Sequence, residues 1–119
     1  MRAALLVSAI VFAGCAARAP SPAGSVAEIR VRGEVVDSWC WSIEEKRGPE
    51  HATCARNCLA NGNPPVLVAD DGTAWLLVPA YDHIPVLEAA KKRAGETVTV
   101  TGTPRERGGM KVLAIRVLE

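Results

Sequence analysis

The sequence predicts a mainly β fold, a small five-stranded barrel over residues 26–119 with two helices. Five segments carry strand signals, either an apolar–polar alternation or a short apolar run. One helix pattern separates the third of these segments from the fourth, and another is inserted between the first and the second. Residues 26–119 have the length of one small domain and contain no internal repeat.

The first strand is predicted over residues 28–37 (EIRVRGEVVD), where apolar residues alternate with charged ones. Gly33 interrupts the alternation, as a bulge or bend in a long strand would. Residues 65–69 (PVLVA) and 73–79 (TAWLLVP) form the next two strands. The Asp71-Gly72 pair between them is a strong hairpin signal.

A helix is predicted over residues 85–94 (PVLEAAKKRA), with Pro85 in its first turn and Gly95 as its C-terminal cap. The alternation returns in residues 97–101 (TVTVT) and 111–118 (KVLAIRVL), which form the last two strands. Residues 104–109 are expected to join these strands as a loop.

This order, with a helix between the third and fourth strands, is that of the OB-fold, a five-stranded barrel. The main alternative is an open antiparallel sheet with the same helix packed on it. Closure into a barrel removes the exposed sheet edges that a small domain otherwise has to protect, and therefore favours the OB-like barrel.

The insert between the first two strands covers residues 38–63. Its helix is predicted to begin at Gly48-Pro49-Glu50, because proline suits the first helical turn and glutamate suits the positive helix end. Asn61-Gly62 is expected to end this helix. The insert helix carries His51, Cys54 and Cys58, whereas Cys40 is expected at the end of the first strand.

Cys40, His51, Cys54 and Cys58 form a C-x10-H-x2-C-x3-C pattern. Residues three and four apart share a helix face, so His51, Cys54 and Cys58 are predicted to line one stripe together with Ala55 and Leu59. Three thiolates and one imidazole are the ligand set of a structural zinc site, and this soft set also suits Cu(I). The first interpretation of the cluster is therefore a Cys3His metal site for zinc or copper.

The second interpretation is a disulfide between Cys40 and either Cys54 or Cys58, which would tie the insert helix to the barrel. A bond between Cys54 and Cys58 fits disulfide geometry poorly while both lie on one helix. The buried face of an amphipathic helix also explains the spacing, because cysteine is a common core residue. A third interpretation is thiol–disulfide exchange, with His51 lowering the pKa of a thiol.

The start of the chain predicts export. Residues 1–14 have the layout of a signal peptide, with Arg2 at the positive end of an apolar run too short to span a bilayer. The ending FAGC, with Cys15 last, resembles the lipobox of bacterial lipoproteins. That resemblance implies acyl chains such as palmitate on Cys15 and a membrane anchor. Residues 15–25 are then the lipidated cysteine and a flexible tether, and Ala16 favours the outer membrane, facing the periplasm.

Two tryptophans flank Cys40. In strand geometry Trp39 and Trp41 would both point away from the side that Cys40 faces. They form either a stacking surface for a small ligand or a cover over the barrel end. Asp37 is expected to be a turn residue, with a backbone hydrogen bond or a contact to His51 as alternatives.

Charge and motif content exclude several function classes. The chain has 14 Lys and Arg residues against 13 Asp and Glu residues and shows no basic stripe, so no nucleic-acid partner is predicted. No nucleophile–base–acid set, phosphate loop or paired-carboxylate site is present in the sequence. The protein is therefore predicted not to be an enzyme.

The stretch 33–65, with its D-x2-C and H-x2-C-x3-C-x3-G-x-P elements, resembles small exported bacterial proteins that have a compact β-barrel domain. The chain is also similar in setting to periplasmic OB-fold copper carriers, which hold Cu(I) beside a tryptophan with histidine and methionine. Here Met110 is the one methionine after the signal segment, and cysteines would replace the others. We therefore expect a non-enzymatic envelope lipoprotein, a disulfide-stapled binding or accessory module for an envelope protein or small ligand. The alternative is a periplasmic metal-binding protein.

Overall fold

The structure, a computed structural model, describes residues 25–119. The predicted signal peptide, the lipidation site Cys15 and all of the tether except Ser25 lie outside the described residues. No helix within residues 25–119 is long and apolar enough to cross a membrane.

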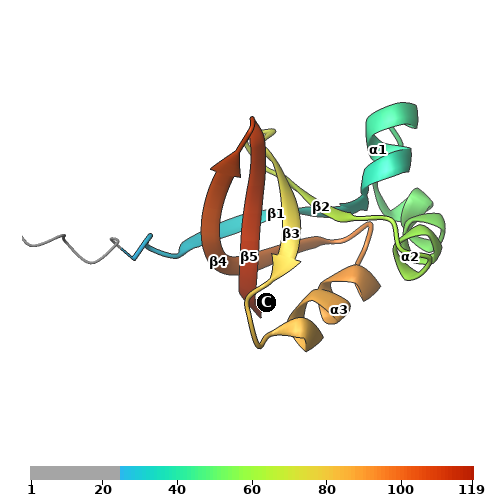
Figure 1. Ribbon diagram of the computed structural model, residues 1–119. Helices are drawn as coiled ribbons and strands as arrows, with labels where there is room; N and C mark the ends of the chain where they lie inside the picture. Colours follow the sequence, from blue (N-terminus) through green and yellow to red (C-terminus); the bar gives the residue numbers. More distant parts are fainter. Residues whose placement is uncertain (1–24) are drawn as a thin grey trace, which may run out of the picture.

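The described chain is a closed five-stranded barrel with helices packed around one end and one side (Figure 1). The strands follow one another around the barrel in the order β1-β2-β3-β5-β4, and β4 pairs back onto β1. The pair β3–β5 is parallel and the other four pairs are antiparallel. The strands are β1 (Ile29–Asp37), β2 (Pro65–Ala69), β3 (Ala74–Pro79), β4 (Thr97–Arg107) and β5 (Met110–Leu118).

The predicted OB-like barrel is therefore confirmed, and the alternative of an open antiparallel sheet is wrong. Helix α3 (Ile84–Lys92) lies between β3 and β4, as its sequence pattern indicated. The inserted segment between β1 and β2 contains α1 (Ser38–Glu44), the short 3-10 helix η1 (Pro49–His51) and α2 (Ala52–Ala60).

Gly33 lies where β1 pairs with both of its neighbours, opposite Ala69 of β2 and Val98 of β4. A Cβ atom at this position would overlap the backbone of Val68. Glycine is therefore needed here for the close approach of two strands, which explains why it interrupts the alternation of β1.

The expected loop over residues 104–109 is wrong, because β4 continues to Arg107 and turns into β5 through Gly108 and Gly109. Both glycines have positive φ angles, of 57° and 81°, as a two-residue hairpin turn requires. Pro104 is tolerated inside the strand because it pairs with β5 alone, beyond the last residue of β4 that pairs with β1.

The core fills the barrel and continues under the helices. Every strand contributes at least one fully or almost fully buried residue to the core, and α3 adds Ala90. Helix α2 contributes Ala55 and Leu59 to the same cluster, so the insert is packed on the barrel. The largest of these buried apolar side chains are those of Leu59, Leu67, Leu77, Leu113, Ile115, Val35 and Val100.

Residues 38–44 form helix α1, so the expectation that Cys40 ends a strand is wrong. The cause is Asp37, whose carboxylate accepts a hydrogen bond from the backbone N–H of Cys40 and caps the helix. Glu45 ends α1 in the left-handed conformation, with φ at 56°. Trp39 and Trp41 consequently lie two positions apart on a helix and do not share a face.

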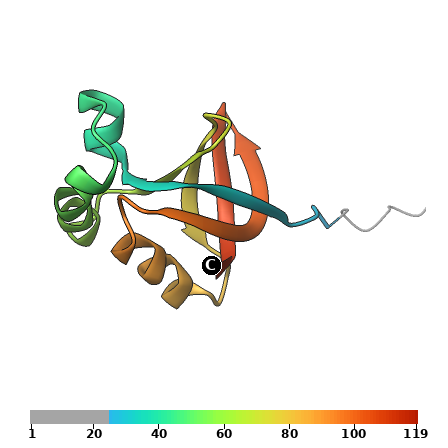
Figure 2. The ribbon, with the colours of Figure 1, turned by 180° about the vertical axis from the view of Figure 1, so that it is seen from behind.

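The start of the described chain and the inserted helices lie at opposite ends of the barrel. The first described residues leave the barrel at the end opposite α1 and α2, as both the front view and the view from behind show (Figures 1 and 2). The inserted helices α1 and α2 lie together at the other end.

Candidate metal centre

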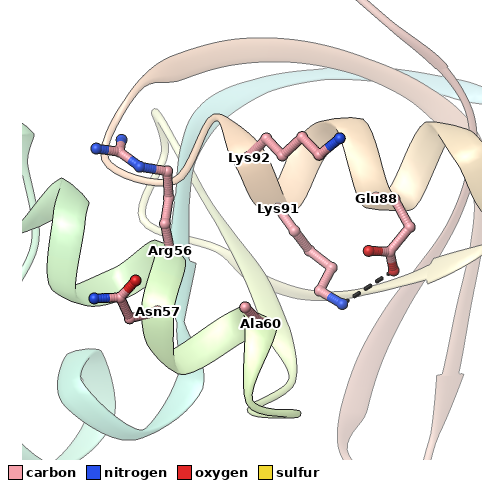
Figure 3. A pocket seen from close by; sticks show the side chains of 6 residues that line it. All are labelled: Arg56, Asn57, Ala60, Glu88, Lys91 and Lys92. Atoms are coloured by element: carbon pink, nitrogen blue, oxygen red, sulfur yellow. Dashed lines mark hydrogen bonds and ion pairs between the residues drawn. The ribbon is translucent and has the colours of Figure 1, made fainter.

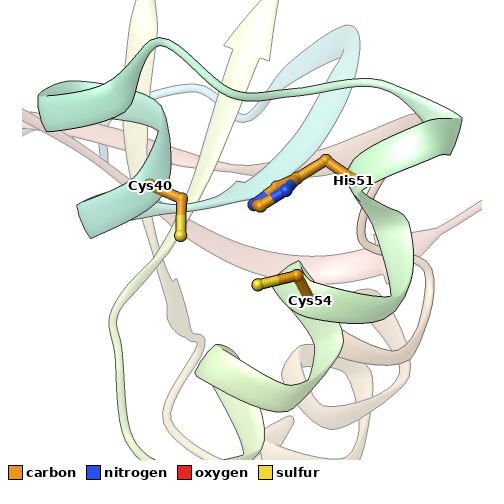
Figure 4. Close-up of side chains that lie close together, drawn as sticks. All are labelled: Cys40, His51 and Cys54. Atoms are coloured by element: carbon orange, nitrogen blue, oxygen red, sulfur yellow. The ribbon is translucent and has the colours of Figure 1, made fainter.

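The predicted cysteine–histidine cluster is assembled at the end of the barrel where the inserted helices lie. Cys40 comes from α1, His51 from the end of η1, and Cys54 from the first half of α2. Their side chains converge on one space between the helices (Figure 4). The sequence spacing alone placed His51 and Cys54 together, and helix α1 brings Cys40 to them.

The ligand atoms form two overlapping groups. In the first, which we call the histidine group, one atom each of Cys40, His51 and Cys54 lies within 4.8 Å of the other two. In the second, the aspartate group, the same holds for Asp37, Cys40 and Cys58. Cys40 belongs to both groups, so the five side chains form one continuous cluster.

The stripe predicted on the insert helix is only partly present. The buried residues of α2 are Ala52, Ala55 and Leu59, which face the barrel. Cys54 is exposed and Cys58 is half-buried, on the flank of α2 that faces α1. Cys54 and Cys58 therefore do not contribute to the barrel core.

Asp37 is fully buried at the junction of β1 and α1. Its Oδ1 atom accepts the hydrogen bond from the backbone N–H of Cys40 at 2.9 Å. Its Oδ2 atom lies 3.6 Å from Nε2 of His51. Neither Oδ2 of Asp37 nor Nε2 of His51 has a hydrogen-bond partner, although both atoms are buried. Orphaned buried polar atoms of this kind are rare, and a bound ion is one explanation for them.

Burial raises the pKa of the Cys40 thiol to about 12, and the hydrogen bond and charge of Asp37 add to this shift. Burial is also the largest cause of a raised pKa at Cys58, to which the nearby charge of Asp37 contributes. Both thiols are therefore protonated at neutral pH in the metal-free protein. A cation bound between them would offset these unfavourable effects and release the thiol protons.

The loop before η1 is fixed by Glu34, a residue of β1 with only 9% of its surface exposed. Its carboxylate accepts hydrogen bonds from Nε of Arg47, at 2.8 Å, and from the backbone N–H of Gly48. On the other side, Gly95 donates its N–H to the carbonyl of Val35 at 2.8 Å. A Cβ atom at Gly95 would overlap Ala52, so this glycine allows the start of α2 to approach the barrel.

The tryptophans do not form one surface. Trp39 is 52% exposed, whereas Trp41 packs on a second apolar cluster with Val36, Val66 and Val68. The expected strand geometry of this pair is therefore wrong. A ligand surface at Trp39 and Trp41 stays a prediction, with Trp39 as its accessible member.

A separate pocket of about 290 Å³ lies between α2 and α3 (Figure 3). Two of its three basic side chains are engaged by neighbours: Lys91 pairs with Glu88 at 3.0 Å, and Arg56 donates to Thr53 at 3.2 Å. The pocket is lined by Arg56, Asn57, Ala60, Glu88, Lys91 and Lys92. It contains no histidine or cysteine and lies apart from the chemistry of the cluster.

Sequence reasoning underestimated Asp37, which it took for a turn residue. An N-cap aspartate accepts a hydrogen bond from the backbone N–H of the third helical residue. The position of Asp37, three residues before Cys40, was therefore the sequence signal for a helix that begins at Ser38. Cys40, Cys54 and Cys58 are free in the structure. Comparison of the chain with models of protein families, with curated proteins and with solved structures gave no match.

Proposed function

We propose that this protein is a metal-binding module of the bacterial cell envelope, which holds a zinc or copper ion with Cys40, His51 and Cys54, beside Cys58. The observation that carries the proposal is the buried, unpaired Nε2 atom of His51, whose ring lies in one group with two thiols. An imidazole nitrogen and two thiolates within 4.8 Å of one another are the donors of a tetrahedral or trigonal metal site.

The resemblance of the chain start to a lipobox supports attachment through Cys15, and thus a lipoprotein that carries the barrel in the periplasm. The module is proposed to bind or carry its ion rather than to catalyse a reaction. Two features support this: no catalytic set appears in the sequence, and the cluster contains only side chains that suit metal binding or thiol chemistry.

A second function has one specific observation in its favour. The Sγ atom of Cys40 belongs to a group with Cys54 and to a group with Cys58, each within 4.8 Å. In an oxidising compartment, thiols this close favour a disulfide from Cys40 to one of the two partners. The protein would then be an accessory module whose insert is stapled to the barrel, with its ligand still to be identified.

The deciding experiment measures the mass of the full protein, purified from a bacterial envelope, before and after denaturation. A metal ion lost on denaturation, with the thiols of Cys40, Cys54 and Cys58 then open to alkylation, supports the metal site. A mass short by two hydrogens, with one of these three thiols alkylated, supports the staple and contradicts the metal proposal.

Two variants test the role of His51. His51→Ala should weaken metal retention, because it removes the nitrogen donor of the histidine group. His83→Ala is the matched control, since His83 is the other histidine of the chain and lies just before α3, outside the cluster. Equal metal retention in both variants would contradict the assignment of His51 as a ligand.

A further inference from the structure

We propose that Asp37 is a direct ligand of the ion and that its carboxylate makes the centre selective for a divalent cation, Zn(II), over Cu(I). This inference rests on the proposed metal-binding function. It goes beyond it by adding an oxygen donor to the site and by choosing between the two metals.

The first argument is burial. Asp37 has no exposed surface, and one of its two carboxylate oxygens has no hydrogen-bond partner. A buried carboxylate is strongly destabilising unless a positive charge lies beside it. Within residues 25–119, the one side chain that forms an ion pair with Asp37 is His51, which is positive only when protonated. A cation bound at Oδ2 supplies the missing charge.

The second argument is distance. The 3.6 Å between Oδ2 of Asp37 and Nε2 of His51 exceeds the length of a normal N–H···O hydrogen bond. Two ligands of one tetrahedral zinc ion, each about 2.0–2.2 Å from the metal, lie roughly 3.4 Å apart. The separation of Asp37 Oδ2 and His51 Nε2 therefore fits two ligands of one ion better than it fits a hydrogen-bond donor and its acceptor.

The third argument is the position of the other donors. Asp37 lies within 4.8 Å of the ligand atoms of Cys40 and Cys58, and Cys40 continues the cluster to Cys54. The carboxylate of Asp37 thus has sulfur donors near it in the aspartate group, and its Oδ2 atom lies 3.6 Å from the nitrogen donor of His51 in the histidine group. Zn(II) accepts all three donor types, whereas Cu(I) is held by soft thiolate and thioether ligands and gains little from a carboxylate.

The substitution Asp37→Asn tests this inference with little change to the fold. Asparagine is as good an N-cap residue as aspartate, so the cap of α1 is retained while the negative charge is removed. Asp70→Asn is the control, because Asp70 is exposed and pairs with Arg32 at the surface. If Asp37→Asn does not fold, Asp37→Ser keeps an N-cap oxygen without a carboxylate.

Zn(II) and Cu(I) affinities of the full-length variants are measured by competition with chromophoric chelators, under reducing conditions. We expect Asp37→Asn to lower Zn(II) affinity by more than about 100-fold, the upper range for the loss of a residue that only orients a ligand. Cu(I) affinity should stay within about threefold of the wild type. The visible spectrum of the Co(II)-substituted protein should change as well, since an oxygen ligand is lost.

Two results would overturn the inference. An equal loss of Zn(II) and Cu(I) affinity would make Asp37 a positioning residue. Unchanged Zn(II) affinity with lower stability of the metal-free protein would make it the partner of a protonated His51. A wild-type protein that binds neither metal would instead contradict the proposed function itself, so the two failures are distinguishable.

Discussion

Glu34 of β1 accepts a hydrogen bond from the backbone N–H of Gly48, fourteen residues further along the chain. The same carboxylate accepts a second bond from Arg47, and both donors belong to the loop that connects α1 to η1. His51 follows Gly48 by three residues and donates its own N–H to the Gly48 carbonyl at 3.1 Å. The barrel wall thereby sets the position of His51, the nitrogen donor of the proposed metal site.

Glu34→Gln should therefore weaken both the fold and the metal site. An amide has one acceptor oxygen in place of two and turns its own N–H groups toward donors, so the free energy of unfolding should fall by about 1–3 kcal/mol. Chemical denaturation measures this loss, and chelator competition should show a lower metal affinity. Glu88→Gln, which removes an exposed pair with Lys91, is expected to change stability by less than about 1 kcal/mol. Equal effects of the two substitutions would contradict the role of Glu34.

The raised pKa of Cys40 predicts a loss of stability at high pH. The thiol has a pKa of about 12 in the folded protein against an ordinary value of 9.0, so the folded state binds the proton more tightly than the unfolded chain. This contribution is fully present below about pH 9 and is lost as the pH rises toward about 12. Denaturation of the metal-free, reduced protein at about pH 8 and about pH 11 measures the decline.

Cys40→Ala supplies the comparison for that measurement, because it removes the titrating thiol and leaves the lysines and Tyr81 unchanged. Its stability should depend less steeply on pH than that of the wild type. Parallel pH profiles of the two proteins would show that Cys40 is not the group responsible.

The three described thiols should react with an alkylating reagent at different rates. Cys54 is exposed and should react first, whereas Cys40 is 5% exposed, has a raised pKa and should react last. Mass spectrometry of digested samples over time gives the order in the metal-free protein. If the proposed site binds zinc, the metal should slow the reaction of Cys54 most, since Cys54 is its accessible proposed ligand. Fast labelling of Cys40 before Cys54 would contradict the described packing of α1.

Gly33→Ala should destabilise the barrel, because a Cβ atom there meets the backbone of Val68, which cannot move aside as a side chain would. Overpacking of this kind costs about 1–3 kcal/mol. Gly72→Ala is the control, since its Cβ has open space and only the positive φ angle of 86° opposes it. Thermal unfolding should show the larger decrease in melting temperature for Gly33→Ala. A larger decrease for Gly72→Ala would contradict the close approach of β1 and β2 at Gly33.

The barrel was predictable from the sequence because its signals are local. Inward and outward residues alternate along β1, β4 and β5, and the Asp71-Gly72 pair marks the turn between β2 and β3. The extent of β4 was missed because Pro104 usually ends a strand. Here the strand continues past Pro104 because this residue pairs with β5 and not with β1, a tertiary feature that the sequence does not show.

The site was predictable only in part. The spacing of His51, Cys54 and Cys58 indicated a shared helix, but the segment SWCWS after Asp37 has no helical apolar period and resembles a strand end. Its helix depends on the Asp37 carboxylate, whose burial at the barrel end is set by residues distant in sequence. Its burial at the barrel end also brings the Asp37 carboxylate close to Cys40 and Cys58. The spacing of residues in the sequence does not reveal this contact.

The described chain enters the barrel at the end opposite α1 and α2 (Figure 2), and this affects where the exposed thiol of Cys54 lies. The described chain therefore begins at the barrel end opposite the inserted helix α2, which carries Cys54. The barrel thus lies between the first described residues and the inserted helices. For a lipoprotein of the proposed kind, this arrangement would hold the exposed thiol of Cys54 on the side of the barrel away from the start of the described chain.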